Sequence, residues 1–219
     1  AGTGLAIAMT VVVAVVYYVK LAPIYPERNR DNTLYLTHVS FKSEQGAMTY
    51  QSALSYRALQ EWIYPLKNVV EVSARFGNAT DYYVQPADRS GDFRPVQKLV
   101  DPAFFRIYEL QFLEGHPFTE ADLASGIHTA VISDDIARRL FGTTEGVVGR
   151  SFSMDYVNYR VCGVVRGASF LTGQSYAQIY VPYSVGLNYK EPGTSSFPYC
   201  GRFNVTFLVK DNAQAEALR

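Results

Sequence analysis

The sequence predicts a mixed α+β domain preceded by one apolar helix. Three observations carry this prediction: residues 1–19 contain no charge, short runs of alternating apolar and polar residues recur further on, and signals for short helices lie between these runs. The composition, 48% hydrophobic and 18% charged, is that of a folded globular chain, so a disordered chain is excluded.

The first element is the apolar segment, and we expect residues 1–20 to form a transmembrane helix that is truncated at its start. Nineteen residues of helix rise roughly 28 Å, which is close to the thickness of a bilayer's hydrocarbon core. Tyr17, Tyr18 and Lys20 then supply the aromatic and basic residues that suit a membrane boundary.

Two other interpretations of this segment are a cleavable signal peptide and a buried helix. A signal peptide would need a basic start, which this segment lacks, and a soluble helix is seldom apolar on every face. The absence of an initiator Met predicts that the chain begins inside a longer protein. Residues 21–32, with two prolines and several charges, are expected to be a linker leaving the membrane.

The expected strands alternate apolar and polar residues or are short and continuously apolar. They are residues 33–40, 69–76, 81–85, 94–100, 129–132, 151–155, 159–165, 178–181 and 203–209. We expect polar turns at 77–79 and, in a hairpin, near Val157-Asn158. From Ser52 a helical period begins, with its apolar stripe on Ala58, Leu59, Trp62, Ile63 and Leu66, and Pro65 should kink or end the helix near that point.

Helix caps predict the remaining helices. Asp101-Pro102 opens a short helix through Tyr108, Thr119 with Asp122 forms a capping-box pattern, and a last helix begins at Asn212. Ser133 caps a helix that ends at Gly142. In that helix Asp134 and Asp135 stand four residues before Arg138 and Arg139, a spacing that predicts ion pairs and argues against an acidic metal site.

Charge and motifs exclude several functions. Twenty basic and twenty acidic residues give zero formal net charge, without the basic excess that nucleic-acid binding needs. Residues 146–151 (GVVGRS) superficially resemble a phosphate-binding loop, but Arg150 stands where such a loop needs Lys. Dinucleotide, zinc-protease and nucleophile-elbow motifs are also absent from the sequence. We therefore assign no catalytic, cofactor-binding or metal-ligating residue and expect no cofactor.

Some residues leave alternatives open. His38, His116 and His128 are not spaced to share a metal on one element, and a dispersed catalytic site that uses one of them with carboxylates remains a rival hypothesis. Cys162 and Cys200 would form one disulfide only if they meet in space. The 17 tyrosines fit a sheet-rich fold, with a tyrosine-lined ligand surface as the alternative.

The middle of the chain resembles the MacB-like periplasmic core domain of ABC transporter permeases, in the MacB/FtsX family. The resemblance lies in five runs that keep the family's order and spacing over about 65 residues. The runs are 100–105 (VDPAFF), 110–122 (LQFLEGHPFTEAD), 129–142 (TAVISDDIARRLFG), 148–151 (VGRS) and 159–165 (YRVCGVV). Residues 166–202 match the family poorly, so their function is left open.

The resemblance implies a porter-like βαβ lobe at 33–100 plus 203–219, with a second α+β lobe inserted at 101–202. It implies a non-catalytic domain on the periplasmic side of the cell inner membrane. The domain would transmit ATP-driven conformational change for export, lipoprotein transport or cell-envelope work. Its implied partners are a separate cytoplasmic ATPase subunit or domain, a second permease copy, a periplasmic adaptor and an outer-membrane duct. A membrane-anchored ligand-binding or sensor domain is the alternative.

Overall fold

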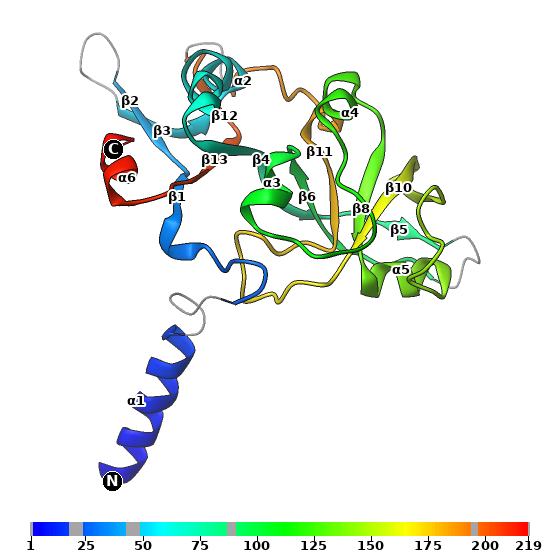
Figure 1. The fold of residues 1–219 in the computed structure, drawn as a ribbon, viewed down its shortest axis with the longest axis horizontal. Helices are drawn as coiled ribbons and strands as arrows, with labels where there is room; N and C mark the ends of the chain where they lie inside the picture. Colours follow the sequence, from blue (N-terminus) through cyan, green and yellow to red (C-terminus); the bar gives the residue numbers. More distant parts are fainter. Residues whose placement is uncertain (1, 18–23, 43–48, 87–90, 194–196, 219) are drawn as a thin grey trace.

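The fold is seen in a computed structural model that describes residues 2–17, 24–42, 49–86, 91–193 and 197–218. The mixed α+β class expected from the sequence is confirmed (Figure 1). The strands are β1 (Thr33–Leu36), β2 (Val39–Lys42), β3 (Thr49–Leu54), β4 (Glu71–Asp81), β5 (Val84–Gln85), β6 (Val96–Val100), β7 (Phe112–Gly115), β8 (Thr129–Ser133), β9 (Ser151–Met154), β10 (Val157–Val165), β11 (Ile179–Pro182), β12 (Cys200–Gly201) and β13 (Phe203–Leu208).

The helices are short apart from the first. They are α1 (Gly2–Val16), α2 (Tyr56–Ala58), α3 (Ala103–Ile107), α4 (Glu120–Ser125), α5 (Asp134–Phe141) and α6 (Asn212–Ala217). Single turns of other helix types complete the set: the 3-10 turns η2 (Arg30–Asn32), η4 (Tyr64–Asn68) and η5 (Tyr183–Val185), and the π-helical turn η3 (Leu59–Ile63).

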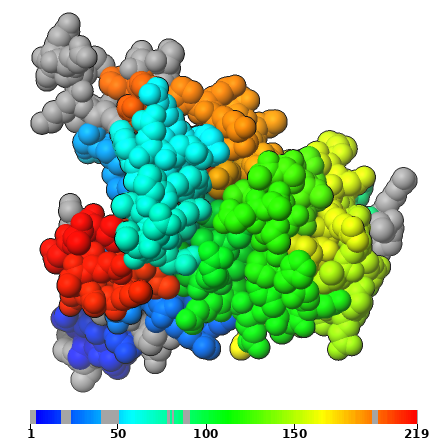
Figure 2. Space-filling view, turned by 45° about the horizontal axis from the view of Figure 1, so that its top comes forward, coloured from blue at the N-terminus to red at the C-terminus, as the bar shows by residue number. Residues whose placement is uncertain are grey.

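One connected sheet joins the described strands, in the order β12-β3-β13-β4-β6-β11-β8-β10-β9-β5, with β1, β2 and β7 added at β13, β3 and β10. The pairs β6–β11 and β8–β10 are parallel, whereas the other pairs are antiparallel. Figure 2 shows the two end regions of the chain (blue and cyan, and red) on one side of the body and the green to yellow middle of the chain on the other.

The central strands are buried on both faces. In β11, Ile179 and Val181 pack into one hydrophobic cluster, while Tyr180 between them packs into a second cluster with Phe104 and Phe105 of α3. Because side chains alternate along a strand, this division places the two clusters on opposite faces of the sheet. The continuously apolar run of β11 follows from this double burial.

Helix α1 extends away from the body of the domain (Figure 1). Its 15 residues carry no charge, and the side chains of residues 4–17 are exposed. Among the described residues, no helix combines the length and apolar character needed to cross a membrane. Residues 18–23, which include Tyr18 and Lys20 of the expected span, lie outside the described residues.

Three predictions near the start of the domain are wrong. The expected strand 33–40 is two strands, because the chain breaks at Thr37-His38 and β2 pairs with β3 while β1 pairs with β13. Residues 52–54, expected to begin a helix, end β3, and Ser55 then caps α2 by accepting a bond from Ala58 N. Trp62, expected on the buried stripe, is 42% exposed and stacks on Tyr199, because the wide π-helical turn departs from the α-helical period.

Two expected turns are also misplaced. Residues 77–79 do not separate two strands but lie within the continuous β4, where Gly77 has φ 67° and the register shifts between Phe76 and Thr80. These features define a β-bulge, whose local sequence resembles that of a turn. The hairpin between β9 and β10 turns at Asp155-Tyr156, both with positive φ, rather than near Val157-Asn158.

The cap predictions fare better. Thr119 and Asp122 form the expected capping box, and Gly142 ends α5 in the left-handed conformation. Asp134 pairs with Arg138 at 2.7 Å, but the expected partner of Asp135 is wrong, because Asp135 accepts from Gln178 and the Arg139 guanidinium lies over the ring of Phe93.

Candidate functional site

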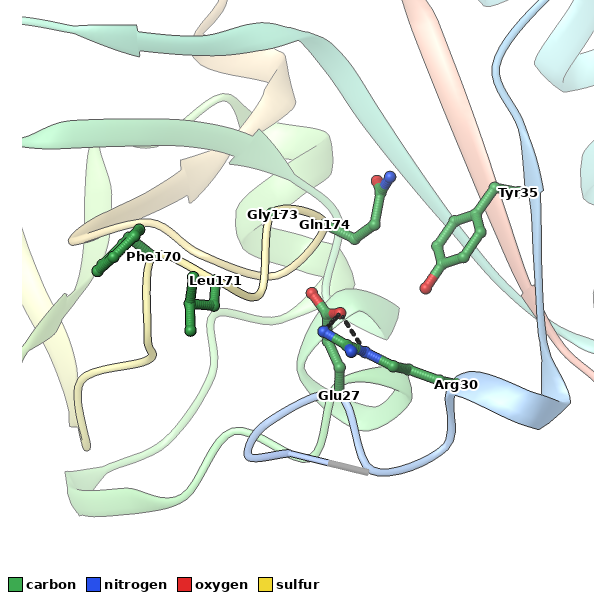
Figure 3. A pocket seen from close by; sticks show the side chains of 7 residues that line it. All are labelled: Glu27, Arg30, Tyr35, Phe170, Leu171, Gly173 and Gln174. Carbon is green, nitrogen blue, oxygen red and sulfur yellow. Dashed lines mark hydrogen bonds and ion pairs between the residues drawn. The ribbon is translucent and has the colours of Figure 1, made fainter. Parts of the chain in front are cut away.

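A cavity of about 550 Å³ lies between the segment that follows α1 and the loop that precedes β11 (Figure 3). Its lining is both charged and apolar, and consists of Glu27, Arg30, Tyr35, Phe170, Leu171, Gly173 and Gln174. We call the surrounding structure the linker–loop junction and define it as residues 24–32, residues 166–178 and Lys98.

Glu27 is the central residue of the linker–loop junction and is only 5% exposed. One carboxylate oxygen, Oε1, accepts hydrogen bonds from the backbone N of Ser175 at 2.8 Å and from its Oγ at 2.9 Å. The other, Oε2, pairs with the Arg30 guanidinium at 2.8 Å (Figure 3). A buried carboxylate is tolerated only when it is paired in this way, so these bonds fix the linker on the loop.

Lys98 holds the same loop from inside the sheet. It lies on β6 with 1% exposure, and its Nζ donates to the backbone carbonyls of Gly173 at 2.9 Å and Gln174 at 2.6 Å. Burial lowers the pKa of Lys98 to about 7; Arg75 lowers the pKa further, and Glu27 opposes the shift.

Two further contacts tie the linker to the domain. The Tyr25 hydroxyl donates to the carbonyl of Arg166 at 2.9 Å and accepts from Gln111 N at 3.1 Å. Asn29 Nδ2 donates to Glu109 Oε1 at 2.9 Å. The linker is therefore attached at several points along its described length.

The loop is ordered by its own buried polar residues. Thr172, fully buried, donates from N and Oγ1 to the carbonyl of Ser169 at 2.9 and 2.6 Å. The Tyr180 hydroxyl, on β11, donates to the carbonyl of Ser175 at 3.0 Å and accepts from Ala177 N. These hydrogen bonds fix the position of the loop relative to the sheet.

The site's chemistry is that of attachment. The carboxylate and the ammonium group described above are each occupied by hydrogen bonds, and burial raises the pKa of Tyr35 to about 12, so its phenol is neutral at physiological pH. A residue poised as a nucleophile or general base would need a free, correctly aimed atom.

The structure brings together two of the three histidines. His116 and His128 line a surface hollow of about 300 Å³ with Asp122 and Cys162, whereas His38 lies exposed next to β2. The groups in this hollow have other partners: Asp122 Oδ2 accepts from Thr119, and His116 Nδ1 lies 2.8 Å from the Pro117 carbonyl. Within the described ranges, His, Cys, Asp and Glu form no group suited to a metal ion.

The cysteines are both free thiols. Cys162 Sγ donates to the carbonyl of Ala130 at 3.4 Å, and Cys200 is fully buried. Burial raises the pKa of both thiols, which keeps them protonated and poorly nucleophilic. The disulfide that the sequence left open is not formed.

The segment that superficially resembles a phosphate loop is built differently. Val147 N donates to Glu114 Oε2 at 3.0 Å and Gly149 N to the carbonyl of Val161 at 2.8 Å, so these amides already have partners. The Arg150 guanidinium lies 4.3 Å from the ring centre of Phe141. These contacts explain the run structurally.

Sequence reasoning missed the residues of the linker–loop junction. The sequence could have indicated Lys98, because a lysine inside the otherwise apolar second half of β6 must find buried partners. Nothing in the sequence indicated the role of Glu27, because an acidic residue in a polar linker is ordinary and its partner Ser175 lies 148 positions away.

The chain is similar to parts of two longer transport proteins. The chain is 28% identical over 142 residues, 62% of its length, to the macrolide export ATP-binding/permease protein MacB of Shigella dysenteriae. It is 35% identical over 83 residues, 37% of its length, to the pyoverdine export ATP-binding/permease protein PvdT of Pseudomonas entomophila. These matches cover 20% and 13% of the relatives' own lengths.

Solved structures share the fold. The periplasmic region of MacB from Actinobacillus actinomycetemcomitans superimposes with a TM-score of 0.58 at 15% identity, covering 85% of this chain and 80% of that one. The extracellular domain of the noncanonic ABC-type transporter YknZ from Gram-positive bacteria gives 0.56 at 17% identity, covering 85% and 88%.

The family model for the MacB-like periplasmic core domain matches residues 2–219. The resemblance found in the five sequence runs is thereby confirmed over almost the whole chain. The chain belongs to the family of MacB-like periplasmic core domains.

Proposed function

We propose that this domain transmits ATP-driven conformational change from the membrane helices of an ABC transporter permease to the periplasm, in export, lipoprotein transport or cell-envelope work. One observation carries the proposal: the buried Glu27 ties the linker after α1 to the loop that enters the central strand β11. The names of the relatives, ATP-binding/permease proteins, support the ABC transporter context.

Movement of a helix reaches a domain only if the connection between them is stiff. Here the linker is attached by the Glu27–Ser175 bonds, by Tyr25 and by Asn29, and Lys98 fixes the receiving loop from behind. A free polar linker would instead let the helix move alone. The described geometry therefore suits transmission of force better than flexible tethering.

We assign the membrane anchor to residues 1–20 and the linker to residues 21–32. The described part of the anchor, α1, is apolar and exposed on all sides, which supports contact with lipid. The domain would then lie on the periplasmic side of the inner membrane.

The lobes are proposed as the family resemblance implies them, with 33–100 plus 203–219 as a porter-like lobe and 101–202 as an inserted lobe. The pairing of β13 with β4 and β1 and the two-sided distribution of colours in Figure 2 support this division. The strands β6 and β11 join the two parts of the sheet.

The proposed partners are a cytoplasmic ATPase subunit or domain and a second permease copy, with a periplasmic adaptor and an outer-membrane duct beyond them. The ATPase is proposed outside this chain because residues 146–151, which superficially resemble a phosphate-binding loop, carry Arg150 in place of Lys and have the amides of Val147 and Gly149 bonded within the fold. The relatives' greater length leaves room for that activity elsewhere.

The test uses the full-length protein with its ATPase in nanodiscs, carrying a spin label at Tyr156→Cys. Tyr156 is fully exposed on the β9–β10 turn, and both native cysteines are at least partly buried. We expect the distance between labels on two copies to shift when a non-hydrolysable ATP analogue binds. In E27A the shift should be lost while ATP hydrolysis persists.

The matched control is R106A, which removes the exposed ion pair of Arg106 with Glu71 outside the linker–loop junction. R106A should shift like the unaltered protein. A wild-type protein whose labels do not move with nucleotide would refute the mechanical role. Equal movement in E27A would refute the role of the linker–loop junction.

The cavity of about 550 Å³ favours the second candidate, a membrane-anchored ligand-binding or sensor domain. Gly173→Leu distinguishes the two, because Gly173 lines the cavity and a Cβ added there meets no atom within 4 Å. If the domain transmits conformational change, the nucleotide-dependent shift of the label distance should survive in G173L. If it is a ligand-binding or sensor domain, that shift should be lost in G173L.

A further inference from the structure

The loop of the linker–loop junction presents an apolar tip to solvent. Phe170 is 75% exposed and Leu171 is 38% exposed. Single exposed apolar residues are ordinary on protein surfaces, so exposure alone would indicate nothing. Three further observations concern this tip in particular.

The first is that the exposure is built into the fold. The tip is followed at once by the fully buried Thr172, which bonds back to Ser169, and then by the two carbonyls that Lys98 holds. Leu171 N also donates to Ser169 Oγ at 3.2 Å. Because the backbone of this loop is already fixed, its exposed apolar side chains can bind a surface without the entropic cost of ordering the loop.

The second observation is position. Figure 1 shows the loop before β11 (gold) at the end of the body nearest α1, beside the blue linker, and the Tyr25–Arg166 and Glu27–Ser175 bonds join the two segments. The seven peptide steps from Tyr17 to Ile24 reach at most about 25 Å. The tip therefore stays close to the point where the apolar helix ends.

The third observation is chemistry. The Arg166 guanidinium lies 5.3 Å from the ring centre of Tyr25, and Arg28 is exposed on the linker. The neighbouring carboxylate of Asp134, which accepts from Gly167 N, is already paired with Arg138. Aromatic and apolar side chains with basic residues beside them are typical of protein segments that lie in the interfacial zone of a bilayer.

We propose that Phe170 and Leu171 form a membrane-contact tip that rests in the interfacial layer of the bilayer beside α1. The inference rests on the proposed function, because it requires α1 to enter the membrane. The tip adds a second, non-covalent point of contact with lipid. It would hold the linker–loop junction against the membrane while the helix moves.

The test places a tryptophan at the tip. The chain has one tryptophan, Trp62, so F170W in a W62F background gives a single fluorophore, in liposomes of phosphatidylcholine with a minor phosphatidylglycerol fraction. With lipids brominated near the headgroup, we expect about twofold quenching of the F170W emission. The control is L187W in the same background, because Leu187 is 86% exposed and follows η5 in the segment after β11, which lies at the opposite end of the body from the blue linker in Figure 1. Circular dichroism checks that both variants fold.

Quenching of F170W that does not exceed that of L187W would overturn the inference. Emission that is blue-shifted but unquenched would overturn it as well, because a protein surface would then cover the tip. Alkaline carbonate extraction separates the two proposals. Release of the chain would contradict the anchor and this inference together, whereas retention with equal quenching would contradict this inference alone.

Discussion

The Glu27 carboxylate accepts both the backbone and the side-chain hydrogen bond of Ser175, at 2.8 and 2.9 Å, although 148 positions separate the two residues. The same carboxylate pairs with Arg30, so one buried group closes the linker onto the loop. This arrangement makes the attachment of the linker sensitive to a change of a single atom.

Replacing Glu27 by Gln should destabilise the domain by about 2–3 kcal/mol, because the new amide NH₂ sets a donor against the donors of either Arg30 or Ser175. Urea denaturation followed by circular dichroism measures the change. The control is E61Q: Glu61 also accepts from an arginine and a tyrosine, Arg57 and Tyr199, but at the surface. E61Q should leave the unfolding midpoint almost unchanged, and equal effects of the two substitutions would contradict the assigned role of Glu27.

Lys98 predicts a pH dependence of stability. Its pKa is lowered to about 7 in the folded protein, so between about pH 7 and 10 the unfolded chain holds a proton on this residue that the folded chain releases. The free energy of unfolding should therefore rise with pH in this window. Above it, the raised pKa of Tyr35, about 12, acts in the opposite direction.

The measurement compares the unaltered protein with K98M at several values between about pH 6.5 and 9.5. K98M loses the bonds to Gly173 and Gln174 at every pH but does not titrate. The stability difference between the two proteins should widen as the pH rises. A difference that stays constant would show that the pKa of Lys98 is not lowered.

Asp101 joins β4 to the start of α3 and is fully buried. Its Oδ1 accepts from Ser73 Oγ at 2.7 Å and Phe104 N at 3.2 Å, and its Oδ2 accepts from Ala74 N at 2.9 Å. D101N should cost about 2–3 kcal/mol, because the amide sets a donor against one of these donors. S73A removes a single bond and should cost about 1 kcal/mol. A thermal or urea unfolding series that ranks S73A below D101N in stability would contradict this account.

Gly115 and Gly126 form a matched pair for separating backbone strain from crowding. Both have left-handed φ, 70° and 67°, but a Cβ at Gly115 would collide with the Cys162 carbonyl and lie 2.7 Å from a methyl of Val148, whereas a Cβ at Gly126 meets open space. We expect G126A to lose about 1 kcal/mol and G115A at least about 2 kcal/mol more. Similar losses in urea denaturation would mean that the close approach of β7 to β10 is not tight.

Two helix-terminus signals that act within four residues were read correctly from the sequence. The Thr119–Asp122 capping box and the glycine stop at Gly142 both depend on bonds inside one turn of helix, so the local residues suffice to specify them. The family resemblance of residues 100–165 covers these same well-defined elements.

Two of the errors lie where distant strands decide the local structure. Residues 52–54 have apolar spacing that suits a helix, but pairing of Leu54 with Phe203 and Cys200 draws them into the sheet. Gly77 carries a turn signal, yet its amide donates to the carbonyl of Arg202 at 2.7 Å, which keeps β4 continuous through a bulge. Such partners lie more than a hundred residues away and leave no mark on the local pattern.

The candidate site could be anticipated only at Lys98, whose charge conflicts with its apolar strand. Its partners are backbone carbonyls of residues 173 and 174, which carry no sequence signature. The site therefore emerges only once β6 and β11 are side by side.

The position of β11 has a mechanical consequence. The strand begins directly after the loop whose Ser175 is hydrogen-bonded to Glu27. It is hydrogen-bonded to β6 on one flank and to β8 on the other. A pull on the linker therefore enters the sheet at its middle and is divided between two ladders, whereas a pull on an edge strand would peel one ladder open bond by bond. Tension on β11 is therefore shared by the hydrogen bonds of both ladders, and the strand can detach only when bonds on both of its flanks break together.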